Sequence, residues 1–259
     1  MSIDRRQKFQ RFRHILKPPY DADDSASFPI FTTDKHFNLD DYASESANHS
    51  VDSFDNLAKA LPDDLFMDLG CGRRSVTLDN VLYVEVYPSV SADLIVAPDC
   101  RYPIRDESLR GIGCFAVLEH TRQPWIVVQE MRRMLKPGGQ VFIDWPFLQP
   151  VHGYPSHFFN ATREGLTSIF EDEGFTVDHA FTGAHQTAAY SVQWLLGRFA
   201  HHLRLTGDVE LLHEFAQMRV SDLVSMSQQD PLWWKFLNAL SPEGFAELAC
   251  GNMLFATKA

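Results

Sequence analysis

Residues 65–72 read Leu-Phe-Met-Asp-Leu-Gly-Cys-Gly, and this stretch decides how the chain is organised. A short apolar run carrying one acid leads into two glycines that are separated by one residue. The pattern is typical of a buried parallel strand that breaks into a tight turn beneath a bound ligand. Gly70 and Gly72 lack Cβ atoms, so the backbone can bend sharply there and approach a ligand closely. An ordinary strand-to-turn junction is the alternative interpretation.

The segment that follows favours the ligand-binding interpretation. Residues 81–84 read Val-Leu-Tyr-Val, which predicts a second buried strand, and Glu85 comes directly after it. An acid at the tip of the second strand of such a sheet can accept hydrogen bonds from both hydroxyls of a ribose. We therefore expect Glu85 to bind a nucleoside.

Composition narrows the class of protein. The 259 residues are 45% hydrophobic and 22% charged, as in a globular protein that buries a large core. The net charge of −11 argues against sequence-blind nucleic-acid binding. The four cysteines show no CxxC spacing, so neither a zinc site nor a redox pair is indicated. No signal peptide and no apolar run long enough for a membrane helix is found, so we expect a cytoplasmic protein with free thiols.

The N-terminal part, residues 1–60, is expected to form a helical cap. Residues 3–16 predict a basic helix that packs through its phenylalanines and leaves its cations in solvent; binding to phosphates or to an anionic membrane is the alternative. Residues 21–41 are polar and interrupted by proline, which predicts a loop. Residues 41–60 predict a second helix, in which Tyr42 is a candidate lid residue.

Strands and helices alternate along the rest of the chain. Further strands are predicted over residues 92–97, 110–118, 140–145, 175–182 and 251–258, and helices over residues 125–135 and 164–173. This alternation predicts an α/β fold, a Rossmann-like doubly wound sheet of seven mainly parallel strands. The ligand should then bind beyond the carboxyl ends of the first strands, where the strand order reverses.

Residues 184–250 form a helical insertion before the last predicted strand. Their apolar residues recur at helical spacing, and we expect a subdomain that packs on itself and on the sheet. A lid over the acceptor site or a homodimer surface is the sharper interpretation. The expected core is therefore residues 61–183 together with residues 251–259.

At this point the chain resembles the class I S-adenosylmethionine-dependent methyltransferases. Four stretches carry the resemblance in order, namely Asp-Leu-Gly-Cys-Gly at 68–72, Glu85, Val-Leu-Glu-His at 117–120 and Leu-Lys-Pro-Gly-Gly at 135–139. The closest branch contains quinone-biosynthesis and other small-molecule methyltransferases. Residues 146–162 look like a sub-branch associated with sugars and surface glycans.

The resemblance implies S-adenosylmethionine as cofactor and a role for each matching residue. Asp68 and the turn would line the methionine portion, Glu85 would bind the ribose, and Asp99 would bind the adenine amino group. The implied cofactor-binding residues are Asp68, Gly70, Cys71, Gly72, Glu85, Asp99 and Cys100. Two departures stand out: Arg74 replaces a glycine that is common in the family, and the connection to the second strand is short.

The chemistry of methyl transfer needs little catalytic machinery. An in-line displacement on a sulfonium depends mainly on holding the two reactants in line. A hydroxyl acceptor also needs a base, and a histidine with a pKa near neutrality suits that role. His152 is the first candidate and His157 the reserve; His120 also follows a strand end, and each histidine could instead be structural. The resemblance implies that Glu119 borders the reacting methyl group, and it is the candidate if no histidine acts. A metal site at His152 and His157 is not indicated, because no third ligand has suitable spacing.

Three functions compete. The leading hypothesis is O-methylation of a sugar-containing or other small-molecule metabolite. The alternative is a catalytically silent methyltransferase-like protein that binds the cofactor or a partner. A nicotinamide-dependent dehydrogenase is disfavoured because the G-x-G-x-x-G pattern would need glycine where Ser75 stands. The sequence does not specify the acceptor.

Overall fold

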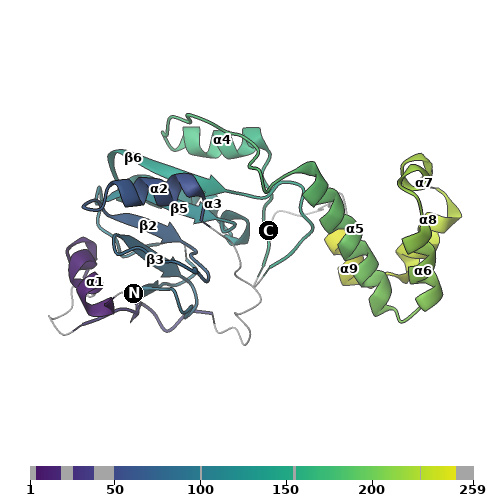
Figure 1. The fold of residues 1–259 in the computed structure, drawn as a ribbon, viewed down its shortest axis with the longest axis horizontal. Helices are drawn as coiled ribbons and strands as arrows, with labels where there is room; N and C mark the ends of the chain where they lie inside the picture. The colour runs from purple at the N-terminus through teal and green to yellow at the C-terminus, as the bar shows by residue number, and fades with distance from the viewer. Residues whose placement is uncertain are drawn as a thin grey trace, which may run out of the picture. The chain divides into compact units, whose positions relative to one another are not determined.

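The computed structural model describes residues 4–18, 26–37, 50–99, 101–153, 156–227 and 229–248. The chain divides into two compact units (Figure 1). The first comprises Met1–Phe147 and Gly153–Phe181, and the second Leu148–His152 and Thr182–Ala259. Each unit is described by itself below.

The first unit is built on a parallel sheet. Its strands among the described residues are β1 (Ile30–Phe31), β2 (Phe66–Leu69), β3 (Val81–Glu85), β4 (Leu94–Ile95), β5 (Leu109–Phe115) and β6 (Leu135–Asp144). Their order across the sheet is β1-β4-β3-β2-β5-β6, and every neighbouring pair runs parallel. The predicted α/β class with a parallel sheet is therefore confirmed.

Helix α2 (Asp52–Ala60) covers one face of this sheet (Figure 1). Its Phe54 ring meets the rings of Phe66 and Phe115, with centroids 6.1 and 5.8 Å apart. Glycines in β5 make room for this aromatic cluster: a Cβ at Gly111 would lie 2.8 Å from the Phe66 ring, and one at Gly113 would lie 2.7 Å from Phe115. The glycines of β5 thus serve close packing of the helix on the sheet.

Three other helices pack on the opposite core cluster. They are α1 (Arg5–Phe12), which continues into the 3-10 turn η1 (Arg13–Ile15), α3 (Pro124–Met134) and α4 (Arg163–Asp172). The basic helix α1 packs through Phe9 and Phe12, as predicted, but one of its cations is buried. Lys8 lies 2.7 Å from a carboxylate oxygen of Asp93 and over the Tyr83 ring. Burial lowers the pKa of Lys8, and Asp93 offsets part of that shift.

The seven-strand prediction is not confirmed, and one strand prediction is wrong. Residues 175–182 contain no strand, although Phe175 and Val177 pack against the core. Alternating burial shows which side of a segment is apolar but supplies no neighbouring strand for its backbone. The predicted strand at residues 251–258 lies outside the described residues. The sequence analysis also missed β1. Its two residues lie in the loop predicted at residues 21–41, and they pair with β4.

Several other boundaries differ from prediction; for example, the strand predicted at residues 92–97 spans Leu94–Ile95, and the strand predicted at residues 110–118 spans Leu109–Phe115. Within the predicted helix at residues 41–60, the described residues begin at 50 and the helix at Asp52, and Tyr42 lies outside the described residues. Strand β6 begins at Leu135, earlier than predicted, and its pairing with β5 is irregular before Gln140. Gly138, with a φ of 73°, allows the irregular backbone there.

The second unit is helical in its described part. Its helices are α5 (Ala188–Leu205), α6 (Val209–Gln217), α7 (Val220–Ser225), α8 (Pro231–Ala239) and α9 (Pro242–Leu248). Phe199, Phe215 and Phe236 anchor its own hydrophobic cluster. In the described helices no segment is both long and apolar enough to span a bilayer.

Candidate functional site

The strand order reverses between β2 and β5. From β2 the chain adds β3 and β4 on one side, and then returns to add β5 and β6 on the other. In doubly wound sheets this reversal opens a crevice at the carboxyl ends of the two central strands. Here Gly70, just after β2, has a φ of 68°, and a Cβ on it would lie 2.3 Å from Val117, just after β5. Ala116 also has a positive φ, of 53°, a strained conformation that is common at functional sites.

Glu85 lies at the end of β3 and is buried. One of its oxygens accepts the N–H of Gly72 at 3.0 Å, and the other accepts the N–H of Val86 at 2.6 Å. The carboxyl group therefore ties the glycine turn to the neighbouring strand. Burial raises the pKa of Glu85 to about 7, and the two backbone donors offset part of the shift.

Asp68, near the end of β2, is paired with Arg74, which the sequence singled out only as a departure from the family. The Nε and Nη2 atoms of Arg74 lie 2.6 and 2.9 Å from the two carboxylate oxygens, so the contact is bidentate. The guanidinium carbon is 5.9 Å from the centre of the Phe115 ring at the end of β5. Burial raises the pKa of Asp68, and Arg74 offsets part of the rise.

The remaining predicted cofactor residues differ in their surroundings. Cys71 is fully buried in the cluster under α2, and burial raises the pKa of its thiol well above the ordinary value. Asp99 is exposed, and one of its carboxylate oxygens accepts the N–H of Arg101 at 3.1 Å. Cys100 lies outside the described residues. The predicted adenine contacts of Asp99 and Cys100 stay predictions.

Glu119 follows β5 in the 3-10 turn η2 (Leu118–His120) and has no solvent exposure. Neither of its side-chain oxygens has a hydrogen-bond partner among the described residues. Burial, with a smaller contribution from the charge of Asp144, raises its pKa to about 8. A buried acid without a partner is costly to the fold, and such groups often belong to functional sites.

One of the predicted histidines, His120, lies beside Glu119, and His157 lies beside His120. The Nε2 atom of His120 is 3.7 Å from a Glu119 oxygen, and its Nδ1 atom is 2.9 Å from the carbonyl oxygen of Ser156. Burial lowers the pKa of His120, which favours the neutral form of the ring. The ring of His157 is 5.6 Å from that of His120, and its Nε2 atom is 2.7 Å from the side-chain oxygen of Asn160.

His152 belongs to the second unit. Its Nδ1 atom lies 2.8 Å from the carbonyl oxygen of Pro150, and its ring is 4.8 Å from that of Trp194. The structure thus shows His152 in a hydrogen-bonded, aromatic setting of its own unit. The base role of His152 stays a prediction.

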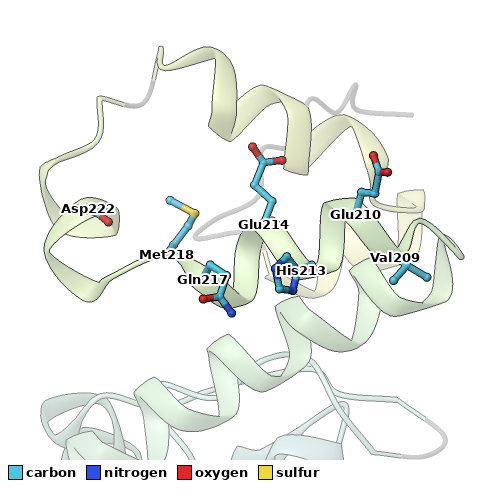
Figure 2. A pocket seen from close by; sticks show the side chains of 7 residues that line it. All are labelled: Val209, Glu210, His213, Glu214, Gln217, Met218 and Asp222. Carbon is cyan, nitrogen blue, oxygen red and sulfur yellow. The ribbon is translucent and has the colours of Figure 1, made fainter.

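Two cavities lie elsewhere in the described part of the chain. One, of about 580 Å³, lies near the amino ends of the strands and is lined by Arg11, Asp63 and Lys136 among others. The other, of about 620 Å³, lies within the second unit (Figure 2). Figure 2 shows Glu210, His213 and Glu214 on α6, and Asp222 on α7, around it.

Part of the chain matches a known family of protein domains. Residues 67–143 match the family model described as a methyltransferase domain. The matched segment begins in β2 and ends in β6, and it contains Asp68, Glu85 and Glu119. The match supports a class I S-adenosylmethionine-dependent methyltransferase. No curated protein matches the chain.

Solved structures give partial likenesses. A chain of the complex between the Haloferax volcanii Trm112 methyltransferase activator and a methyltransferase is 16% identical, with a TM-score of 0.35; the match covers 49% of this chain and 75% of that one. Phosphoethanolamine N-methyltransferase 2 of Haemonchus contortus, with S-adenosylhomocysteine, is 17% identical with a TM-score of 0.35; the match covers 71% of this chain and 48% of that one. The [4+2]-cyclase SpnF is 14% identical with a TM-score of 0.37; the match covers 74% of this chain and 82% of that one. Each of these TM-scores is below 0.5, so no function is inferred from these structures.

Proposed function

We propose that this chain transfers a methyl group from S-adenosylmethionine to a hydroxyl of a small molecule, with a sugar-containing metabolite as the leading acceptor class. One observation carries the proposal. The carboxyl ends of β2, β3 and β5 bring the buried acids Asp68, Glu85 and Glu119 to the edge where the strand order reverses. A buried acidic edge suits a ligand that is a cation and carries ribose hydroxyls.

The residues of the turn fit the cofactor. Gly70 and Gly72 have φ values of 68° and 53°, so the backbone bends where only glycine is unstrained. Glu85 can accept ribose hydroxyls with the lone pairs that its two backbone donors leave over. The cofactor supplies an electrophilic methyl group on a sulfonium.

Glu119 is the residue that favours transfer over simple binding. Its carboxyl group is buried and lacks a hydrogen-bond partner among the described residues, so its ionised form, which becomes populated as the pH rises toward 8, can receive a proton from an acceptor hydroxyl. A pKa of about 8 makes the carboxylate a stronger base than an ordinary glutamate. His120 lies next to it, His157 lies next to His120, and His152 is the further candidate base from the sequence.

The test has a binding step and a transfer step. Calorimetry should show that S-adenosylmethionine and S-adenosylhomocysteine bind, and that NADH does not. Transfer of a labelled methyl group to a panel of sugar-containing and phenolic hydroxyl compounds should then identify the acceptor. Glu119→Gln should reduce turnover on the order of 10²–10⁴-fold while S-adenosylhomocysteine still binds. Binding of NADH without the S-adenosyl ligands would refute the proposal.

A catalytically silent protein would behave differently. Its native chain and its Glu119→Gln variant would bind the S-adenosyl ligands with equal affinity. Neither would transfer label to any acceptor in the panel.

A further inference from the structure

Exposed aromatic side chains gather on one surface of the first unit. Trp125, in the first turn of α3, has its ring centre 6.0 Å from that of Phe159. The Phe159 ring is in turn 6.4 Å from that of Phe158. Trp125, Phe158 and Phe159 are 42%, 38% and 39% exposed, and we call these three residues the aromatic cluster. A contiguous exposed apolar surface often marks a binding site.

Backbone hydrogen bonds hold the aromatic cluster at the end of β5. The N–H groups of Phe158 and Phe159 donate to the carbonyl oxygen of Glu119 at 2.6 and 3.3 Å. The indole N–H of Trp145, just after β6, donates to the carbonyl oxygen of Phe159 at 3.1 Å. The aromatic cluster is therefore fixed to the turn that carries Glu119, the base of the proposed reaction.

One cation lies beside the aromatic cluster. Arg122 is exposed, and its guanidinium carbon is 5.2 Å from the centre of the Phe158 ring. Among the described residues no acid pairs with Arg122 and no acceptor meets its side-chain N–H groups. A guanidinium carries five N–H donors in a plane, which match the oxygens of a phosphate or a carboxylate. The surface thus offers an apolar face and, next to it, a donor for an anionic group.

The open form of this surface favours a sugar ring over a wholly apolar ligand. Drug-like ligands are mostly enclosed by the pockets that bind them, whereas these aromatic rings are more than one third exposed. A sugar ring has an apolar C–H face that can stack on an aromatic ring, and its hydroxyl groups gain from staying in water. An arginine beside the stacked ring would select sugars that carry a negative charge.

We propose that Trp125 and Phe159 stack on the sugar ring of the methyl acceptor, and that Arg122 pairs with a phosphate or carboxylate of the same acceptor. The acceptor class is thereby narrowed to anionic sugars. The inference rests on the proposed function, because the stacked ring is the one whose hydroxyl would meet Glu119.

The experiment compares charged sugars with their neutral counterparts. Ligand-observed NMR titrations of the full chain, with S-adenosylhomocysteine present, would use the 1-phosphates, the uronates and the neutral methyl glycosides of glucose and galactose. Arg122→Ala should weaken binding of the charged sugars about 5- to 10-fold and leave the neutral glycosides unchanged. The phosphates and the uronates distinguish the two anionic groups, and binding of either class supports the inference.

Variants of the aromatic cluster should behave differently from Arg122→Ala. Trp125→Ala should weaken charged and neutral sugars alike, about 2- to 10-fold, and Trp125→Phe should keep most of the affinity. Arg132→Ala, at an exposed position in the same helix, is the matched control and should bind every sugar as the wild type does. Because Arg122 and Trp125 are exposed, these variants should fold.

Three results would overturn this inference. The first is equal weakening of charged and neutral sugars by Arg122→Ala, or no weakening of either. The second is wild-type affinity in Trp125→Ala. The third is binding to phosphatidylglycerol vesicles that Trp125→Ala abolishes, without binding of any sugar, which would assign the aromatic cluster to a lipid surface.

The proposed function can fail separately. Failure of the wild type to bind any S-adenosyl ligand would overturn the proposed function, whatever the sugars do. Methyl transfer to a phenolic hydroxyl compound, with no binding of the sugar phosphates or uronates, would overturn only the role of the aromatic cluster and Arg122.

Discussion

Replacing Glu119 by glutamine should make the sheet unit less sensitive to rising pH. The carboxyl group is fully buried, and in the fold its pKa is about 8 instead of the ordinary 4.5. Between these values the folded protein holds a proton that the unfolded chain has released. Stability therefore falls as pH rises through this window and levels off above it. Glutamine is neutral throughout, so this contribution disappears in Glu119→Gln.

The two pKa values set the size of the effect. One proton of difference between the folded and unfolded states changes the free energy of unfolding by about 1.4 kcal/mol per pH unit. Between about pH 5.5 and pH 7.5 the free energy of unfolding of the wild type should fall by roughly 2.5 kcal/mol more than that of Glu119→Gln. The comparison isolates Glu119, because other buried carboxyl groups, such as Glu85, contribute equally to both proteins.

Hydrogen exchange of the β2 and β5 amides measures this stability in the first unit alone. Glu171→Gln, at an exposed position in α4, is the matched control and should follow the wild-type pH dependence. Identical slopes for the wild type and Glu119→Gln over this pH range would refute the assignment of a buried, proton-carrying acid at the end of β5.

Three further predictions concern the same unit. Lys8→Met should lower the free energy of unfolding of this unit by about 3–5 kcal/mol, because Asp93 is left buried without its cation. The double variant Lys8→Met/Asp93→Asn should recover part of this loss. Denaturant unfolding of the wild type, the single variants and the double variant measures the coupling, and additive effects would count against a coupled pair. The affinity for S-adenosylhomocysteine should rise about tenfold between pH 6 and pH 8 as Glu85 ionises. Calorimetry should find that the affinity of Glu85→Gln does not change with pH. A wild-type affinity that is equally independent of pH would contradict ribose binding by the carboxylate. Gly70→Ala should destabilise the sheet unit by about 2–4 kcal/mol, because residue 70 has a φ of 68° and its new Cβ would meet Val117. In thermal unfolding, adding Val117→Ala should recover part of that stability. A Gly70→Ala variant as stable as the wild type would mean that the turn is misplaced.

The parts of the fold that are local in sequence could be predicted. The apolar runs of β2 and β3 and the glycines after β2 are adjacent residues whose pattern reports burial and turning. Glu85 could be placed at a strand tip for the same reason. The two-residue β1 left no readable pattern, because its pairing with β4 is made across more than sixty residues of chain.

Contacts through space set the limits of prediction at the site. The sequence showed Arg74 as an unusual residue, but nothing local indicated that its side chain returns to Asp68. Lys8 lies in a helix whose other cations suggested a solvated face, and only the position of Asp93 on the sheet explains its burial. Gly70→Val would be expected from sequence to block the cofactor, whereas the structure shows that a side chain there first meets Val117.

The three acids at the switch point have different charge environments, and the differences bear on function. Asp68 has an arginine, and Glu85 has two backbone donors, so each is partly compensated within the fold. Glu119 has neither, although it is as deeply buried as the other two. A fold gains no stability from an uncompensated acid, so a role with a ligand is the simplest reason for keeping one there. Of the three, Glu119 is therefore the residue whose replacement should affect turnover most and folding least, because glutamine removes the titratable proton and keeps the shape.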